Sequence, residues 1–287
     1  MNVKIALPNK GRLYEPTLAL LTKAGLILTE QDERVLVART VDPEVTAIFI
    51  RAADIPRFVE SGAADLGVTG YDYIVESRAR VVELLDLEYG RSKIVIAAHE
   101  KTGITTVGEI RPEMKIATKL VNITHDYLRS KAREAIIIRI SGAAEIMPHI
   151  GVSDLVVDTT STGTTLKAQG LQVIDEILES TSRLIANKGS LLRKESKVRE
   201  LVTAVESVVR ATKKKLIMMN VPEARLQNVI EEIPSMGGPT LAKVESPTPM
   251  WEVYSVVEEK EVYKIISSVK KVGARDIIVL PIERIIP

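Results

Sequence analysis

The stretch "DLVVDTTSTGTTLKAQG" (Asp154–Gly170) changes character halfway along, and this change decides how the surrounding chain folds. An apolar run leads into Asp158, and the next seven residues are all Ser, Thr or Gly. The run predicts a buried strand ending at Asp158, and helical periodicity resumes around Thr165–Gln169. The residues between them form a strand-to-helix turn, which in a parallel α/β sheet lies at the carboxyl edge, where ligands bind.

The residue types in this turn suit a sugar phosphate. Backbone N–H groups at a helix start attract phosphate, and Gly163 permits a positive φ and close backbone approach. A carboxylate repels phosphate but accepts hydrogen bonds from sugar hydroxyls, so Asp158 suits a ribose diol. An ordinary Ser/Thr turn that caps a helix explains the same residues on physical grounds alone. The candidate hydroxyl donors are Ser161, Thr162, Thr164 and Thr165.

Short apolar runs alternate with helical patterns through the first 180 or so residues. Helical periodicity covers Tyr14–Ala24 and Ala52–Gly62. Such alternation predicts parallel sheets with helices on both faces, and two such units meeting near Tyr89–Lys93 enclose a cleft. The predicted strands are Val3–Leu7, Val45–Ile50, Ala64–Gly70, Lys93–Ala98, Lys115–Thr118, Ala135–Ile140 and Asp154–Asp158.

The last part of the chain has a shorter and more regular pattern. A long amphipathic segment, Glu195–Lys215, predicts a connecting helix with one buried stripe. After it, strand and helix patterns follow in the order βαββαβ over roughly 70 residues, which is typical of a ferredoxin-like sandwich. We therefore expect an α/β protein with one lobe from residues 1–92 and 180–212, a second from 93–179, and a C-terminal domain from 213–287.

Composition excludes several classes of function. Lys+Arg total 39 and Asp+Glu total 38, and only 3% of residues are aromatic, so the sequence predicts no nucleic-acid partner. No cysteine is present, which excludes thiolate nucleophiles, and the three histidines lie far apart in sequence. Any metal is then expected to be Mg²⁺ arriving with phosphate. No leader-like segment or apolar span of 18 residues occurs, so we expect a soluble cytoplasmic protein with no membrane partner.

Several segments together carry a family resemblance. "DTTSTGTTL" (Asp158–Leu166) resembles the loop by which phosphoribosyltransferases bind 5-phosphoribosyl-1-pyrophosphate (PRPP). "LPNKGRL" (Leu7–Leu13), "RAADIPRFVESGAADLGVTGYD" (Arg51–Asp72) and Ser141–Leu171 are similar to ATP phosphoribosyltransferase, the first enzyme of histidine biosynthesis. "KKLIMMNVP" (Lys214–Pro222) and "ARDIIVLPIE" (Ala274–Glu283) resemble the regulatory domain of its long form.

This resemblance implies a reaction and a fold. Members of the family transfer the 5-phosphoribosyl group of PRPP to N1 of ATP and release pyrophosphate, with Mg²⁺ as cofactor. The chemistry needs alignment of two substrates and stabilisation of developing charge more than acid–base catalysis. The implied fold is a periplasmic-binding-protein-like pair of lobes followed by a regulatory, histidine-binding domain. The implied partners are ATP, PRPP, histidine as a feedback inhibitor, and further copies of the chain in a hexamer or dimer.

The resemblance also assigns candidate site residues. One departure concerns adenine, because Leu120 and Val121 stand where many relatives carry an aromatic residue followed by Pro. Without the resemblance, a solvated basic loop explains Lys10 and Arg12, and helix capping explains Thr69 and Asp72. The expected catalytic residues are Lys10, Arg12, Arg51 and Asp158; the PRPP-binding residues are Asp158, Thr159, Ser161, Thr162, Gly163, Thr164 and Thr165; the ATP-binding residues are Lys10, Gly11, Arg12, Arg51, Thr69, Gly70, Asp72 and Leu120; and the histidine-binding residues are Asn220, Thr240 and Ser255.

Three other readings remain open from the sequence. The PRPP-like turn alone also fits a different phosphoribosyltransferase. Two α/β lobes around a cleft also suit a solute-binding protein, although no export signal is evident. A purely regulatory ligand-binding assembly is the third. Turnover in the presence of ATP, PRPP and Mg²⁺ distinguishes the enzyme from both binding proteins.

Overall fold

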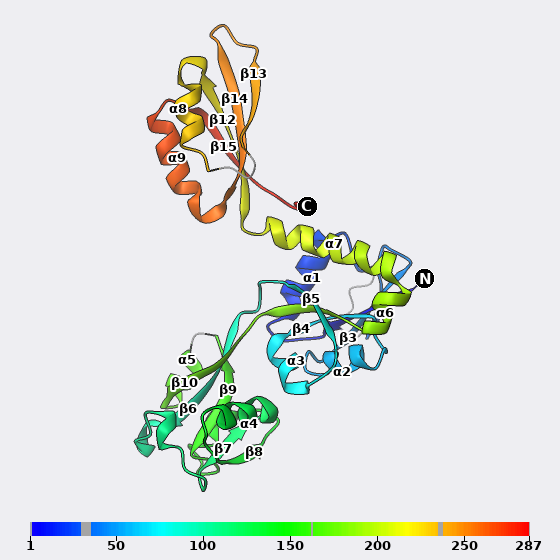
Figure 1. Ribbon diagram of the computed structural model, residues 1–287, viewed down its shortest axis with the longest axis vertical. Coiled ribbons are helices and arrows are strands. Elements are labelled where there is room, and N and C mark those ends of the chain that lie inside the picture. The colour runs from blue at the N-terminus through cyan, green and yellow to red at the C-terminus, as the bar shows by residue number, and fades with distance from the viewer. Residues whose placement is uncertain (1, 30–35, 162, 235–237, 287) are drawn as a thin grey trace. The chain divides into compact units, whose positions relative to one another are not determined.

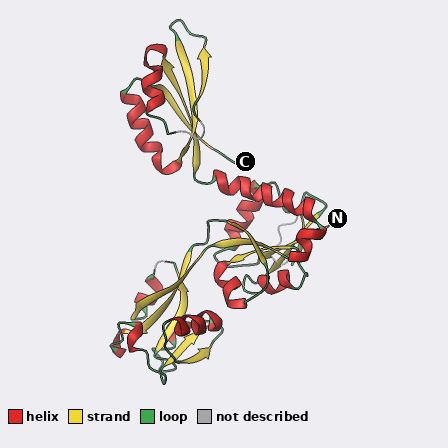
Figure 2. Ribbon diagram, viewed as in Figure 1, coloured by secondary structure: helices red, strands yellow, loops and turns green. Residues whose placement is uncertain are grey.

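The computed structural model describes residues 2–29, 36–161, 163–234 and 238–286. The chain divides into two compact units, one formed by Met1–Thr22 and Leu26–Val202 and the other by Lys23–Gly25 and Thr203–Pro287. The colours of Figure 1 show the order of the elements along the chain, and Figure 2 shows that every sheet has helices packed beside it. Two sheets belong to the first unit and one to the second.

The first sheet has six strands in the order β2-β3-β1-β4-β11-β5. Strands β3, β1 and β4 run parallel to one another, whereas β2 pairs antiparallel with β3, and β11 pairs antiparallel with β4 and β5. The strands alternate with helices because each buried apolar run is followed by an amphipathic segment. The bounds are β1 Val3–Pro8, α1 Tyr14–Lys23, β2 Val37–Arg39, β3 Val45–Ile50, α2 Ile55–Glu60, β4 Leu66–Gly70, α3 Tyr71–Ser77, β5 Val82–Asp86, β11 Ser182–Ala186, α6 Lys188–Arg193 and α7 Glu195–Ala211.

The second sheet has five strands in the order β10-β6-β9-β7-β8. Strands β7, β8 and β9 run parallel, and β6 pairs antiparallel with both β9 and β10. One core cluster lies between this sheet and α4, and it includes Ile94, Ile116, Leu120 and Leu155. The bounds are β6 Ser92–His99, β7 Lys115–Thr118, α4 Val121–Ser130, β8 Ile136–Arg139, β9 Leu155–Thr160, α5 Thr164–Ala168 and β10 Leu171–Ser180, with single 3₁₀ turns at Glu100–Thr102, Val107–Glu109 and Ala144–Ile146.

The prediction of parallel sheets is correct only in part, because each sheet of the first unit contains antiparallel as well as parallel strand pairs. Strand β6 (Ser92–His99) is buried on both faces over most of its length, which is the pattern of a parallel strand. Burial on both faces follows from helices covering the sheet and does not depend on strand direction. The hydrophobic pattern therefore placed the strand correctly but could not show which way it runs.

The C-terminal unit has a four-stranded antiparallel sheet in the order β13-β14-β12-β15. Its element order is βαββαβ, as the sequence predicts. The two helices cover one face, where a core forms around Ile217, Met219, Val253 and Val269. The bounds are β12 Lys214–Pro222, α8 Leu226–Glu231, β13 Thr240–Val244, β14 Met250–Glu258, α9 Val262–Lys271 and β15 Arg275–Pro281. The fold class is thus the predicted one, a two-lobed α/β part followed by a ferredoxin-like domain.

Candidate active site

The Asp158–Thr165 turn connects β9 to α5, as the sequence predicts, although β9 continues to Thr160. The N–H of Thr159 donates to Asp158 Oδ1 at 2.7 Å, and the N–H of Gly163 donates to Thr160 Oγ1 at 2.8 Å. Gly163 has φ +78°, and a Cβ there would meet no atom within 4 Å. The turn thus requires glycine for its backbone conformation rather than for space. Thr162 lies outside the described residues.

Lys119 lies opposite this turn, with its Nζ 3.0 Å from Asp158 Oδ1. Lys119 follows β7 directly, and β7 is the parallel neighbour of β9, so both side chains emerge at the same sheet edge. Burial disfavours the charged form of Lys119, but the charge of Asp158 and its hydrogen bond outweigh it, so the pKa of Lys119 is raised above its usual value. Lys119 is therefore a cation at neutral pH, and it neutralises the carboxylate of the turn.

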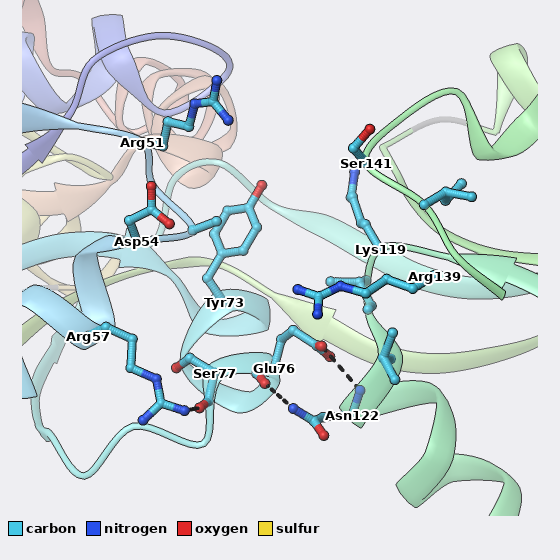
Figure 3. Close-up of a pocket in the computed structure, with 14 residues that line it drawn as sticks. Arg51, Asp54, Arg57, Tyr73, Glu76, Ser77, Lys119, Asn122, Arg139 and Ser141 are labelled. Atoms are coloured by element: carbon cyan, nitrogen blue, oxygen red, sulfur yellow. Dashed lines mark hydrogen bonds between the residues drawn. The ribbon is translucent and has the colours of Figure 1, made fainter. Parts of the chain in front are cut away.

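A cavity of about 1030 Å³ lies beside Lys119, and Figure 3 shows its lining. Four of the lining side chains, Arg51, Arg57, Lys119 and Arg139, are cations, whereas Asp54 and Glu76 are acids. Such a concave, cation-rich site suits a ligand carrying several phosphates. The remaining lining residues are Ala53, Tyr73, Ser77, Leu120, Val121, Asn122, Ile140 and Ser141.

Glu76 accounts for part of the acidic charge at this cavity. Its carboxylate accepts the backbone N–H groups of Asn122 at 3.1 Å and Ile123 at 3.0 Å, in the first turn of α4. The Asn122 side chain returns a hydrogen bond to the Glu76 carbonyl at 2.7 Å, as Figure 3 shows. A carboxylate at a helix N-terminus is stabilised by the unpaired N–H groups and the helix dipole. Glu76 thus holds the start of α4, and with it Leu120, at the cavity wall.

Asp72 and Arg12 form a second cluster of predicted residues. Asp72 is fully buried, and its Oδ2 lies 3.5 Å from Arg12 Nη2. Burial raises the pKa of Tyr73, and the negative charges of Asp72 and Asp158 add to this rise, whereas Lys119 and Arg12 oppose it. Tyr73 therefore stays a neutral phenol, and its hydroxyl interacts electrostatically with charged residues of both lobes. These shared interactions place Arg12, Asp72 and Tyr73 in one electrostatic neighbourhood with Lys119 and Asp158.

The other predicted nucleotide residues have plainer surroundings. Thr69 is fully buried and its hydroxyl donates to the Ala52 carbonyl at 2.6 Å, which fixes the loop carrying Arg51. Gly70 precedes α3, and a Cβ there would lie 2.1 Å from Asp72 Oδ1, so only glycine leaves room for that carboxylate. Lys10 and Gly11 are exposed in the turn after β1. Of the predicted set, Arg51 and Leu120 line the cavity.

The three residues expected to bind histidine do not share one face of the C-terminal sheet. Ser255 is buried and alternates with Val253 and Val257, so it faces the helices. Asn220 lies on the opposite face, because it alternates with the core residues Met219 and Val221, and it donates to Asp276 Oδ2 at 3.1 Å. Thr240 pairs with Tyr254, and both also lie on the face opposite Ser255.

Sequence reasoning missed several residues that line the cavity, above all Lys119, Arg139, Tyr73 and Glu76. The rule that identified Asp158 also identifies Lys119 and Arg139, because each lies at the carboxyl end of a parallel strand of the same sheet. Tyr73 is next to Asp72 in sequence. The role of Glu76 gave no sequence signal, since its partners lie 46 and 47 residues away.

Among the described residues, no three His, Asp or Glu side chains gather closely enough to hold a metal ion. The rings of His99 and His149 approach to 6.2 Å between centroids. No helix in the described part of the chain has both the length and the apolar character to cross a bilayer.

Comparison with known proteins agrees with this geometry. The family model described as ATP phosphoribosyltransferase matches residues 51–207, and that of the HisG C-terminal domain matches residues 211–284. The chain is 47% identical to the ATP phosphoribosyltransferase of Ignicoccus hospitalis, over 99% of this chain and 100% of that protein. It is 46% identical to that of Methanocella arvoryzae, over 99% of each.

A solved structure extends the comparison to three dimensions. A chain of the ATP phosphoribosyl transferase (HisG:HisZ) complex from Thermotoga maritima superposes with a TM-score of 0.64 at 30% identity. The match covers 72% of this chain and 98% of that one. On the family match, the near-complete coverage of the relatives and the shared fold, the chain belongs to the ATP phosphoribosyltransferase family of pentosyl-transferring enzymes.

Proposed function

We propose that the chain transfers the 5-phosphoribosyl group of PRPP to N1 of ATP, releasing pyrophosphate, as the first step of histidine biosynthesis. The observation that carries the proposal is the pairing of Asp158 with Lys119 beside a cation-rich cavity. A carboxylate for a ribose diol and cations for phosphates thus occur next to each other. The names of the relatives at 46–47% identity support this choice of substrates.

The turn after β9 is the proposed PRPP site. Asp158 accepts hydrogen bonds from the ribose hydroxyls, and the backbone N–H groups of the turn bind the 5-phosphate together with the hydroxyls. Lys119 Nζ lies 3.0 Å from Asp158 Oδ1, so the ribose hydroxyls would share this carboxylate with Lys119, whose charge is available to a phosphate of PRPP. The proposed contributors to this site are Asp158, Thr159, Ser161, Thr162, Gly163, Thr164 and Thr165.

The loops after β1, β3 and β4 are the proposed ATP site. Arg51 and Leu120 line the cavity, where Leu120 offers aliphatic contact to the purine in place of aromatic stacking. Thr69 acts through the loop it fixes, because its hydroxyl already binds the Ala52 carbonyl. The proposed contributors are Lys10, Gly11, Arg12, Arg51, Thr69, Gly70, Asp72 and Leu120, and Arg139 adds positive charge for the phosphates.

The reaction itself is one displacement at the anomeric carbon of PRPP. The bond from that carbon to the pyrophosphate oxygen breaks as adenine N1 forms its bond to the same carbon. The leaving pyrophosphate gains negative charge, which Lys10, Arg12 and Arg51 are proposed to stabilise. Holding both substrates in reactive alignment supplies much of the remaining acceleration.

Mg²⁺ is the proposed cofactor, held mainly by the phosphates of PRPP. The ion usually takes one or two protein carboxylates together with substrate phosphates and water. Asp158 is a partly exposed carboxylate close to the proposed ribose site and fits such a single contact. When bound, the ion neutralises the charge that develops on pyrophosphate.

The test offers ATP, GTP, CTP and free adenine with PRPP and Mg²⁺, and measures pyrophosphate release and product mass. We expect release only with ATP, and a product heavier than ATP by one phosphoribosyl group. Release with a free base would indicate a different phosphoribosyltransferase. Tight uptake of ATP or PRPP without any product would indicate a binding protein.

Feedback inhibition by histidine is a further part of this proposal. It is supported by the resemblance of Lys214–Pro222 and Ala274–Glu283 to the regulatory domain of the long form, in the part of the chain that matches the HisG C-terminal domain. Histidine would favour one state of a homo-oligomer, and ATP or PRPP another. Equal PRPP affinity and unchanged turnover with and without histidine would contradict it. Light scattering tests the assembly, for which we expect a dimer or hexamer.

A further inference from the structure

Ser180 lies where the chain passes from one sheet of the first unit to the other. It is the last residue of β10, in the five-stranded sheet, and β11 of the six-stranded sheet begins at Ser182. Its ladder partner is Ser92, the first residue of β6. Both serines are 1% exposed. The site is therefore a buried crossing point between the two lobes.

The hydroxyl of Ser180 makes two hydrogen bonds within the described part of the chain, and both are to Asp72. Its hydroxyl donates to Asp72 Oδ1 at 2.8 Å, and its Oγ accepts the Asp72 backbone N–H at 3.0 Å. These bonds fix both the first turn of α3 and the orientation of the carboxylate. Gly70 contributes by its lack of a side chain, since a Cβ there would occupy the position of Oδ1.

The other oxygen of the carboxylate is left without a hydrogen bond. Asp72 Oδ2 is buried and has no hydrogen-bond partner among the described residues, although it forms an ion pair with Arg12, whose Nη2 is 3.5 Å away. An unsatisfied buried carboxylate oxygen is costly, so its retention calls for an explanation. Its orientation toward Arg12 supplies one, because it can restrain a cation that must meet a charged ligand.

We propose that Ser180 is a positioning residue for the nucleotide side of the reaction, which orients Asp72 so that Asp72 holds Arg12 for its substrate. The proposal rests on the proposed function, in which Arg12 faces ATP and the leaving pyrophosphate. It predicts an effect on ATP and on turnover rather than on the KM for PRPP, because the charge on the leaving pyrophosphate develops only in the transition state. The turn proposed to bind the ribose and 5-phosphate of PRPP belongs to β9 and α5 and makes no hydrogen bond to Ser180 among the described residues.

The chain offers a matched control for this experiment. Ser92 has the same burial, the same residue type and the adjacent position, but its Oγ has no hydrogen-bond partner among the described residues. Ser92→Ala therefore removes the same atom from the same crossing point without removing an interaction. Steady-state kinetics of both variants, together with their thermal unfolding, separate loss of positioning from loss of stability.

We expect Ser180→Ala to lower kcat/KM for ATP by about tenfold, as loss of a hydrogen bond to a charged group does. The KM for PRPP, and both parameters in Ser92→Ala, should stay within about twofold of the wild type. In an Arg12→Gln background, Ser180→Ala should cost less than about twofold, because both changes act through the same contact. If Arg12→Gln turns over too slowly to assay, the ATP affinity of Arg12→Gln with and without Ser180→Ala is measured by calorimetry instead.

Equal kinetics of Ser180→Ala and Ser92→Ala would overturn the proposal, and so would fully additive effects of Ser180→Ala and Arg12→Gln. Ser180 would then serve only to cap the start of α3. If Ser180→Ala does not fold, Ser180→Cys keeps the volume and a weaker donor, and an intermediate loss confined to ATP is expected. A Ser180→Cys enzyme with unchanged ATP kinetics would also overturn it. An inactive wild type would contradict the proposed function itself, and this inference with it.

Discussion

Lys119 Nζ lies 3.0 Å from Asp158 Oδ1, so the carboxylate of the proposed PRPP turn already has a cationic partner. The two residues come from neighbouring parallel strands and meet at one sheet edge. Their side chains are 37% and 17% exposed, which leaves the pair open to a ligand. The pair thus provides opposite charges suited to the two ends of a phosphorylated, hydroxyl-bearing substrate.

Replacing Lys119 should impair PRPP binding. We expect Lys119→Met to raise the KM for PRPP about tenfold, because one charge-assisted contact to phosphate is lost. Lys131→Met is the control, since Lys131 pairs with Asp175 at 3.1 Å at the far end of α4 and does not line the cavity. An unchanged KM for PRPP in Lys119→Met would show that Lys119 serves only the folded structure.

Glu76 should stabilise the fold through α4. Glu76→Gln removes the charge that two N–H groups of the helix start share, and we expect a loss of about 1 kcal/mol of unfolding free energy. Glu113→Gln is the control, because its ion pair with Arg111 has both side chains 68% exposed. Urea unfolding measures both, and equal stability of the two variants would contradict the capping role.

Asp65 should make stability depend on pH. Burial opposes its ionisation, but Lys194, the Lys4 N–H and Ser190 together hold its pKa below the usual value. A lowered folded-state pKa contributes stability that is complete above the unfolded value of about 4 and is lost as pH falls through the folded value. Thermal unfolding between pH 7 and pH 3 should therefore show a loss that Asp65→Asn lacks.

Asp65→Asn should itself destabilise the protein by about 3 kcal/mol at pH 7, because it breaks an ion pair in which Asp65 is buried and leaves the partly buried Lys194 without its charge partner. Asp126→Asn breaks a pair with Arg78 in which both side chains are about half exposed, so it should cost under about 1 kcal/mol. Equal losses in the two variants would contradict the role assigned to burial.

Gly70 should tolerate no side chain. In Gly70→Ala the new Cβ would lie 2.1 Å from Asp72 Oδ1, so the carboxylate must turn away from Ser180. We expect about 1–3 kcal/mol of destabilisation and a raised KM for ATP. Gly108→Ala, whose nearest atoms would be 3.6 and 3.7 Å away, should be close to wild type. Wild-type kinetics in Gly70→Ala would contradict the placement of Asp72.

The sequence predicted the positions of the strands better than the directions in which they run in the sheets. Apolar runs along the chain gave the positions of β1, β3, β7 and β9 to within a few residues. They did so because a buried strand requires consecutive apolar side chains, which can be recognised locally. Strand direction and order depend on partners far along the chain, so the antiparallel pairing of β6 could not be read. The βαββαβ order of the C-terminal unit was predictable since each element there is short and bounded by turn residues.

The site was predictable only where its residues follow strand ends. Asp158 and Arg51 lie at or directly after strand ends, and the neighbouring sequence also resembled a known family. Lys119 and Arg139 lie at strand ends as well, but no motif marked them as functional. The contact between Ser180 and Asp72 joins residues 108 apart in sequence, and no local pattern reveals it. Such contacts are set by the pairing of strands, which is a property of the whole sheet.

The most direct test is the ATP-dependent release of pyrophosphate from PRPP by the wild type and by Asp158→Asn. Asparagine keeps the size of the side chain but lacks the charge that accepts the ribose hydroxyls and pairs with Lys119. We expect robust release by the wild type and a loss of at least about 100-fold in the variant, with little change in its thermal unfolding. Equal rates for the two proteins would contradict the assignment of this turn to PRPP.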